Sequence, residues 1–236
     1  MQRSCDGHHA THPRTDRNTD LLCASRVGEQ ATMSYPRPEN ARSLRSVATA
    51  AKRCRACDLW KLGTQTVFGD GPRTATAMFI GEQPGDQEDK AGEPFVGPAG
   101  RVLDEAFETA GIDRSAIYLT NAVKHFKWRP KGKRRLHEKP NGAEVRACGH
   151  WLELELALVK PTLVVALGAT AAQALLGPAF RVTQERGKVR SSPLATRVMA
   201  TVHPSSILRA PDETRASEMA AFVKDLRIAA KLIREG

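Results

Sequence analysis

Residues 76–110 read TAMFIGEQPGDQEDKAGEPFVGPAGRVLDEAFETA, and this stretch joins a predicted strand, a glycine-rich loop and a predicted helix. The run Thr76–Ile80 has the composition and length of a buried strand and ends at Gly81. Residues Gly100–Ala110 carry apolar side chains at helical spacing, and Gly111 follows as a C-cap. A strand that leads into a helix in this way is typical of α/β proteins with a parallel sheet.

The same alternation continues along the chain. We predict further strands at residues 117–123, 163–167 and 198–202, and helices at 41–53, 143–159, 169–176 and around 219–233. The segment Leu163–Leu167 is apolar throughout, as expected for a strand that is buried on both faces. The predicted fold class is α/β, a three-layer α/β/α sandwich with a central four-stranded parallel sheet. We expect residues 41–236 to form this domain and residues 1–40 to be a disordered or poorly packed extension.

The positive charge of the chain is concentrated in one stretch. The 236 residues carry a formal net charge of +10. Between residues 124 and 139 only Glu138 is acidic, whereas the cations are Lys124, Lys127, Arg129, Lys131, Lys133, Arg134, Arg135 and Lys139. Such a stretch can be a solvated loop, but its density in a basic chain favours a polyanionic partner such as nucleic acid.

Cysteine usage and the lack of an apolar N-terminal segment indicate a cytoplasmic protein. The chain has five cysteines, an odd number, so a disulfide framework is not favoured, and Cys54-Arg-Ala-Cys57 suggests a metal or redox pair. The longest apolar stretch, residues 161–180, is interrupted by glycines and a glutamine and fits a strand plus a helix better than a membrane span. We expect no membrane association.

Three segments with unusual residues follow predicted strands: Gly81–Gly100, Lys124–Lys139 and His203–Arg209. Because ligand groups gather at the carboxyl ends of parallel strands, we expect the three segments to meet in one crevice. Each is weak evidence alone. The first is neither a P-loop nor a GxGxxG loop and could be an acidic turn, and a single histidine at a strand end is usually structural.

Together, however, these motifs resemble the uracil-DNA glycosylase superfamily. The resemblance lies in GEQPG at residues 81–85, PFVGPAG at 94–100, Thr120-Asn121, and His203-Pro204-Ser205. The Cys54-x-x-Cys57 start is similar to the iron–sulfur, family 4-like branch, and KRRLH at residues 133–137 is similar to the basic loop of the UdgX group. The resemblance covers residues 41–233.

The resemblance implies a role for each motif residue. Phe95 would stack on a uracil flipped out of the DNA, Asn121 would read its polar edge, and His203 would donate to the uracil oxygen where charge develops. Glu82 and Gln83 would lie beside the sugar as catalytic residues. Gly81, Asp86 and Ser205 would contribute to the substrate site, and Lys133, Arg134 and Arg135 would hold phosphates.

The resemblance also implies a [4Fe–4S] cluster. Its ligands would be Cys54, Cys57, His125 and Cys148, with a histidine where the four-cysteine relatives have their third cysteine. Cys23 and His150 are rivals for the fourth position, although His150 would face away from Cys148 on a helix. From residue types alone, zinc held by three cysteines and one histidine is an alternative.

His137 carries the most specific implication of the resemblance. After uracil leaves, a neutral imidazole at this place would attack C1′ and form a covalent protein–DNA adduct, so that the enzyme acts once. The alternatives are a hydrolytic iron–sulfur uracil-DNA glycosylase with turnover, and a metal-stabilised single-strand binding module without chemistry. We expect a monomeric, cytoplasmic and nucleoid-associated protein that acts on uracil-containing single-stranded DNA.

Overall fold

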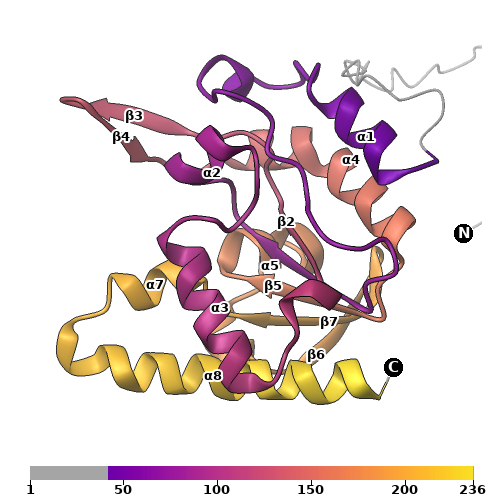
Figure 1. Cartoon of the computed structure of the whole chain (residues 1–236), viewed down its shortest axis with the longest axis vertical. Coiled ribbons are helices and arrows are strands. Elements are labelled where there is room, and N and C mark those ends of the chain that lie inside the picture. Colours follow the sequence, from indigo (N-terminus) through magenta and orange to yellow (C-terminus); the bar gives the residue numbers. More distant parts are fainter. Residues whose placement is uncertain (1–41, 236) are drawn as a thin grey trace, which may run out of the picture. The chain divides into compact units, whose positions relative to one another are not determined.

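The computed structural model describes residues 42–235. The predicted extension, residues 1–40, lies outside the described residues, so its packing stays a prediction. A five-stranded sheet with the order β2-β1-β5-β7-β6 forms the centre of the domain (Figure 1). Its strands are β1 (Ala77–Gly81), β2 (Tyr118–Asn121), β5 (Leu163–Leu167), β6 (Val189–Ser192) and β7 (Ala195–Thr201). The strands β2, β1, β5 and β7 are parallel, as predicted. Strand β6 pairs antiparallel with β7 at one edge of the sheet.

Helices cover both faces of the sheet and complete the predicted three layers. Alternate residues of each strand face opposite sides, so that Phe79 packs in one core cluster and Met78 and Ile80 pack in the other. The first cluster includes side chains of α3 (Pro98–Ala110) and α8 (Asp212–Arg234). The second includes side chains of α4 (Gly142–Val159) and α5 (Ala169–Leu176). Burial on both faces explains why the central strands are apolar throughout.

A third, smaller cluster includes Cys54, Cys57 and Cys148. Helix α1 (Leu44–Ala51) and the 3-10 helix η1 (Asp58–Lys61) contribute to it together with α4. Ser43 begins α1 with a capping box, in which its hydroxyl accepts from the backbone N–H of Ser46. Buried members of the cluster include Cys54, Cys148 and Trp151. The start of the domain therefore packs on α4 around thiol groups.

Several elements were not predicted from the sequence. The segment 81–100, expected to be a loop, contains α2 (Asp86–Ala91), and the basic stretch is a β-hairpin of β3 (Trp128–Lys131) and β4 (Arg134–His137). The edge strand β6 was also missed, because its residues are mostly exposed and polar. The remaining short elements are η2 (Arg114–Ala116), α6 (Val182–Glu185) and α7 (Pro204–Leu208). Among the described residues, no helix is long and apolar enough to cross a membrane.

Candidate active site

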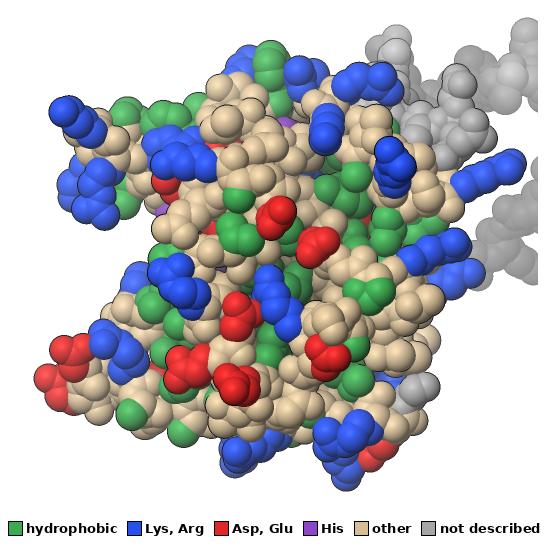
Figure 2. All heavy atoms as spheres, viewed as in Figure 1, with side chains coloured by type: hydrophobic (Ala, Val, Ile, Leu, Met, Phe, Trp, Pro, Cys, Tyr) green, Lys and Arg blue, Asp and Glu red, His purple; other side chains and the backbone are tan. Residues whose placement is uncertain are grey.

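The three segments predicted to converge do line one cavity. It has a volume of about 880 Å³ and lies at the carboxyl ends of the parallel strands. In Figure 2 the surface is hollowed between the protruding hairpin and α7. The predicted site residues that line the cavity are Glu82, Gln83, Asp86, Phe95, Asn121, His137, His203 and Ser205. Lys133 and Arg134 lie farther out, exposed on the hairpin.

Phe95 is held in an unusual backbone conformation inside the cavity. Its φ of 58° lies in the left-handed region, which costs a non-glycine residue free energy and persists only where the surroundings impose it. The side chain is nevertheless buried, with 5% exposed. Gly81 makes room for it, because a Cβ on Gly81 would overlap both the Phe95 ring and the Asn121 carboxamide. The end of β1 therefore lets the proposed stacking ring and the proposed reading amide approach closely.

Glu88, which was not among the predicted site residues, fixes the loop that carries Phe95. Its carboxylate accepts from the backbone N–H of Gly85 at 3.1 Å and from that of Gly97 at 2.8 Å. One buried side chain thus joins the two ends of the segment around Phe95. The signal that could have found it is a glutamate three residues after Gly85, which is the N-cap of α2.

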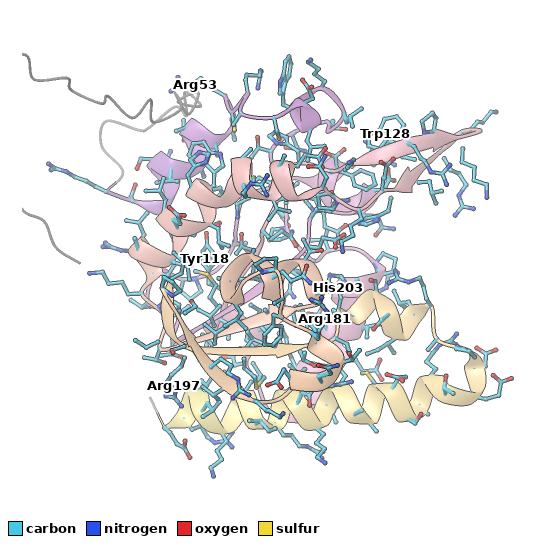
Figure 3. The ribbon with its side chains drawn as sticks, turned by 180° about the vertical axis from the view of Figure 1, so that it is seen from behind. Arg53, Tyr118, Trp128, Arg181, Arg197 and His203 are labelled. Atoms are coloured by element: carbon cyan, nitrogen blue, oxygen red, sulfur yellow. The ribbon has the colours of Figure 1, made fainter. Side chains whose placement is uncertain are left out.

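His203 caps α7 and presents a defined tautomer. Its Nδ1 accepts from the backbone N–H of Ser205 at 3.2 Å and lies 2.8 Å from the Ser205 hydroxyl. Burial lowers the pKa of His203 to about 4, although the Glu82 carboxylate opposes this effect. The neutral ring therefore carries its proton on Nε2. The His203 ring lies nearly parallel to the Phe95 ring, with 6.2 Å between the centroids, and its position at the start of α7 can be followed in Figure 3.

Glu82 and His137 form a carboxylate–histidine pair across the cavity. His137 Nε2 lies 3.3 Å from Glu82 Oε1, and the His137 side chain is 50% exposed. Thr170 donates a second hydrogen bond to Glu82. Burial raises the pKa of Glu82, but the hydrogen bonds from His137 and Thr170 outweigh burial and hold it below its ordinary value. Thr170 lies three residues after the end of β5, where ligand groups of parallel sheets gather.

Gln83 holds the base of the hairpin. Its amide nitrogen donates to the carbonyls of Lys127 at 3.2 Å and Glu138 at 3.1 Å, and its Oε1 accepts from the Lys127 N–H at 3.1 Å. The side chain is therefore committed to the two ends of the hairpin, although it also lines the cavity. Trp128, labelled in Figure 3, adds an anchor because its indole N–H donates to the Leu62 carbonyl at 2.8 Å.

Three of the eight cations in the basic stretch form ion pairs within the protein, so not all of the eight are available to a polyanionic partner. Lys124 is fully buried beside Glu155. Lys127 pairs with Glu144 at 3.1 Å. Arg135 forms ion pairs with Asp86 and Asp89 of α2, the latter at 2.6 Å, and so fastens the hairpin to α2. The cations that remain exposed are Arg129, Lys131, Lys133, Arg134 and Lys139.

The predicted metal ligands gather only in part. Cys54, Cys57 and Cys148 belong to one cluster and are unpaired, and burial raises the pKa of Cys148 to about 12. His125 is buried as well, but its Nε2 lies 3.0 Å from the Thr66 hydroxyl. Within residues 42–235, no three or more His, Cys, Asp or Glu side chains are arranged to hold a metal ion. Cys23, a rival ligand, lies outside the described residues, and His150 contacts the Ala147 carbonyl on its own helix.

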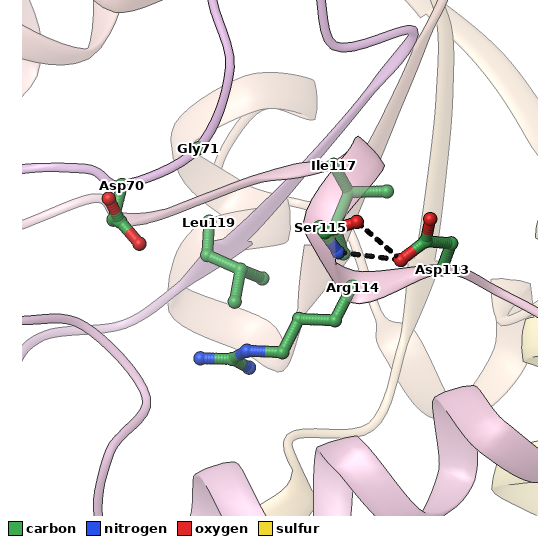
Figure 4. A pocket seen from close by; sticks show the side chains of 7 residues that line it. All are labelled: Asp70, Gly71, Asp113, Arg114, Ser115, Ile117 and Leu119. Carbon is green, nitrogen blue, oxygen red and sulfur yellow. Dashed lines mark hydrogen bonds between the residues drawn. The ribbon is translucent and has the colours of Figure 1, made fainter.

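A second cavity of about 450 Å³ lies beside β2 (Figure 4). Asp70, Arg114 and Leu119 are among its lining residues, and Asp113 there accepts two hydrogen bonds from Ser115. None of the residues predicted for the site lines this cavity. The chemistry-bearing side chains are thus concentrated in the larger cavity.

Comparison with known proteins agrees with this arrangement. Residues 68–227 match the model of the uracil DNA glycosylase superfamily. The chain is similar to type-4 uracil-DNA glycosylases from Thermotoga maritima, at 36% identity over 80% of this chain and 94% of that protein, and from Pyrobaculum aerophilum, at 36% over 68% and 82%. A third, from Archaeoglobus fulgidus, is 35% identical over 72% of this chain and 85% of its own length. The chain belongs to the uracil-DNA glycosylase superfamily.

Proposed function

We propose that the protein excises uracil from single-stranded DNA and then captures the sugar on His137, as in the UdgX group. The single observation that carries the capture step is the His137–Glu82 pair, which faces the cavity that holds Phe95, Asn121 and His203. Membership of the superfamily and similarity to type-4 uracil-DNA glycosylases support the excision step.

Excision requires a base that is held outside the stack and a stabilised leaving group. The buried Phe95 ring would stack on uracil, and the Asn121 carboxamide would pair with its O4 and N3–H. As the C1′–N1 bond breaks, its electron pair leaves with uracil and negative charge grows on the uracil oxygens. The neutral His203 would donate its Nε2–H to this charge.

The proposed capture step requires a neutral His137 ring. A neutral ring that donates one N–H to Glu82 keeps a lone pair on its other nitrogen. Attack of that lone pair forms the N–C1′ bond, Glu82 takes up the remaining ring proton, and the departing uracil anion is protonated in turn. The product is a neutral alkylimidazole, which is a poor leaving group, so the adduct should persist.

The exposed side of the hairpin fits a phosphate backbone. Figure 2 shows lysine and arginine side chains on the protruding hairpin, and Lys131, Lys133 and Arg134 are exposed there. Cations of this kind bind phosphates without reading sequence. We propose single-stranded DNA bound by a monomer as the substrate complex, and a cytoplasmic, nucleoid-associated protein follows from that substrate.

For the cofactor, we propose a [4Fe–4S] cluster on Cys54, Cys57 and Cys148 with His125 as the fourth ligand. The shared cluster of three unpaired cysteines supports the thiolate ligands. His125 would have to exchange its contact with Thr66 for the iron. When bound, the cluster would tie residue 54 to residue 148 and have a structural role. Brown protein with visible absorption is expected, and colourless protein with stoichiometric zinc would contradict the proposal.

The second candidate function is a hydrolytic glycosylase with turnover. The half-exposed His137 side chain favours it, because water could reach C1′ from the same side. The third alternative, a binding module without chemistry, predicts no uracil release at all.

One denaturing gel with a uracil-containing single strand separates these functions. We expect wild-type protein to give one denaturation-resistant adduct per uracil, and His137→Ser to give free uracil without an adduct. Arg134→Ser, at an exposed hairpin position nearby, is the matched control and should still form the adduct. Free uracil with turnover and no adduct from wild-type protein would favour the hydrolytic candidate. An adduct formed by His137→Ser would place the nucleophile elsewhere.

A further inference from the structure

The Lys124–Glu155 pair is buried beneath the proposed uracil-reading residue. The side chains of Lys124 and Glu155 are 1% and 0% exposed, respectively. Lys124 follows β2 by three residues, and Glu155 comes from α4, so the pair joins the end of a strand to the helix that covers it. Nothing in the proposed excision or capture steps uses either residue.

All polar atoms of the pair have partners. The Lys124 ammonium donates to Glu155, to the Thr120 hydroxyl at 2.7 Å and to the Asn121 carbonyl at 2.7 Å. Glu155 also accepts from the Gly69 N–H at 2.9 Å and from the Tyr118 hydroxyl at 3.1 Å. A buried network that is fully satisfied in this way is rigid, whereas loss of one charged partner leaves the other charge uncompensated.

The network acts on Asn121 through the backbone. Lys124 binds the carbonyl of Asn121, and the next two N–H groups of the chain donate to the carbonyls of Gly81 at 2.9 Å and Glu82 at 3.0 Å. The Asn121 side chain meanwhile lies against Gly81 and Phe95. The peptide from which the carboxamide projects is therefore held by the ammonium and by the end of β1 together.

We propose that Lys124 and Glu155 are positioning residues for Asn121, which set the orientation of its carboxamide in the cavity. The proposal rests on the proposed function, in which Asn121 reads uracil. It predicts that the pair contributes to excision only through its effect on the Asn121 side chain. Disruption of the pair should then slow excision only while that side chain is present.

A double-mutant cycle tests this prediction. Lys124→Met with Glu155→Gln removes both charges together and avoids a lone buried charge. The first-order rate constant of uracil release is measured with excess protein on a uracil-containing single strand, because that constant does not depend on the folded fraction. We expect it to fall about tenfold in the wild-type background and not to fall further in the Asn121→Ala background.

The control is a second ion pair, partly buried, that lies outside the cavity. Arg186 and Asp225 are 2.7 Å apart, and Asp225 also accepts from the Thr201 hydroxyl. Arg186→Met with Asp225→Asn should lower stability without changing the rate constant. If the Lys124/Glu155 variant does not fold, Thr120→Val removes one shared hydroxyl and should show a smaller loss with the same dependence on Asn121.

The outcomes separate the two proposals. Wild-type protein that releases no uracil contradicts the proposed function. Wild-type protein that releases uracil, with equal losses in both backgrounds, overturns the positioning role alone and leaves the pair a purely structural element. A loss confined to the background that retains Asn121 supports the positioning role.

Discussion

The strand ends that carry Asn121 and His203 and the hairpin that carries His137 face the same cavity, but different interactions hold them. The strand ends belong to the buried sheet, where Asn121 is 3% exposed. Among the strands of residues 42–235, the two hairpin strands pair only with each other, and Gln83 and Arg135 fasten the hairpin at its edge. His137 on it is half-exposed. In the proposed function, base excision depends on these strand ends, which form the floor of the cavity, and capture depends on the hairpin. The two steps should therefore be separable by substitution.

Replacement of His203 should have the largest effect among these predictions. His203→Ala removes the donor to the departing uracil, and loss of one such donor costs roughly 10²–10³-fold in rate. We expect the single-turnover rate constant of uracil release to fall by about that factor, while binding to uracil-free DNA is unchanged. Ser206→Ala, which alters a neighbouring hydroxyl that donates to the His203 carbonyl, is the control. Equal loss in both variants would contradict the role of the His203 ring.

Release of the hairpin should separate the two steps. Arg135→Gln removes the ion pairs to Asp86 and Asp89 that fasten the hairpin to α2. We expect adduct formation to slow about tenfold, since misplacement of a reacting group has steep costs, while uracil release changes much less. Adduct and free uracil are quantified from the same reaction. The exposed neighbour is the control: with protein in saturating excess over DNA, Arg134→Gln should leave both yields unchanged. A parallel loss of both products in Arg135→Gln would show that the steps are not separable.

The outer hairpin should contribute affinity rather than chemistry. On single strands each phosphate contact contributes about 0.7 to the slope of log affinity against log salt concentration, so Lys133→Gln with Arg134→Gln should reduce the slope by about 1.4. Binding isotherms at several salt concentrations measure it. Lys224→Gln with Arg227→Gln removes two exposed cations from α8 as a control. A slope that does not change in the hairpin variant would mean that these side chains do not touch the backbone.

The contrast between floor and hairpin also explains which parts of the structure could be predicted. Strand β5 was predicted to the residue, because a strand buried on both faces is apolar throughout. The convergence of the three segments followed from the strand-end rule. The hairpin was predicted to be a loop, because its strands show no alternation of buried and exposed residues: all of their residues are exposed except Trp128 and Arg135, which are only partly buried.

Buried charge was the harder problem. Lys124 stood among exposed cations in the sequence, and its partner Glu155 is 31 residues away, so only the folded packing of α4 on β2 brings the two together. The ion pairs of Arg135 were not predicted for the same reason, because its partners Asp89 and Asp86 lie 46 and 49 residues before it. Local patterns therefore locate a site at strand ends, whereas the pairing of its charges depends on contacts between distant segments.

Lowering the pH tests the role of the neutral His203 ring, and it should have the smallest effect on activity among these predictions. The pKa of His203 is lowered to about 4 from an ordinary value of 6.5, because burial disfavours the charged ring. The ring is neutral above about pH 4, so excision should vary little between pH 5 and 8 through this group and should fall as the pH drops through about 4. Protonation there would also set a ring N–H against the Ser205 N–H that now donates to Nδ1.

The same pKa makes a prediction about stability, with a definite sign. Because the folded-state pKa lies below the unfolded one, the unfolded chain binds more protons between about pH 6.5 and 4, and the free energy of unfolding should decrease as the pH falls through that window. A shift of this size corresponds to about 3 kcal/mol. Denaturant unfolding of wild-type protein and His203→Gln at pH 7 and pH 5 isolates the contribution, since all other groups are common to both. The difference in stability between pH 7 and pH 5 should be larger for wild-type protein than for the variant. Equal differences would mean that His203 has the same pKa in the folded and the unfolded protein. They would contradict the proposal that the cavity keeps its ring neutral, with a single N–H donor.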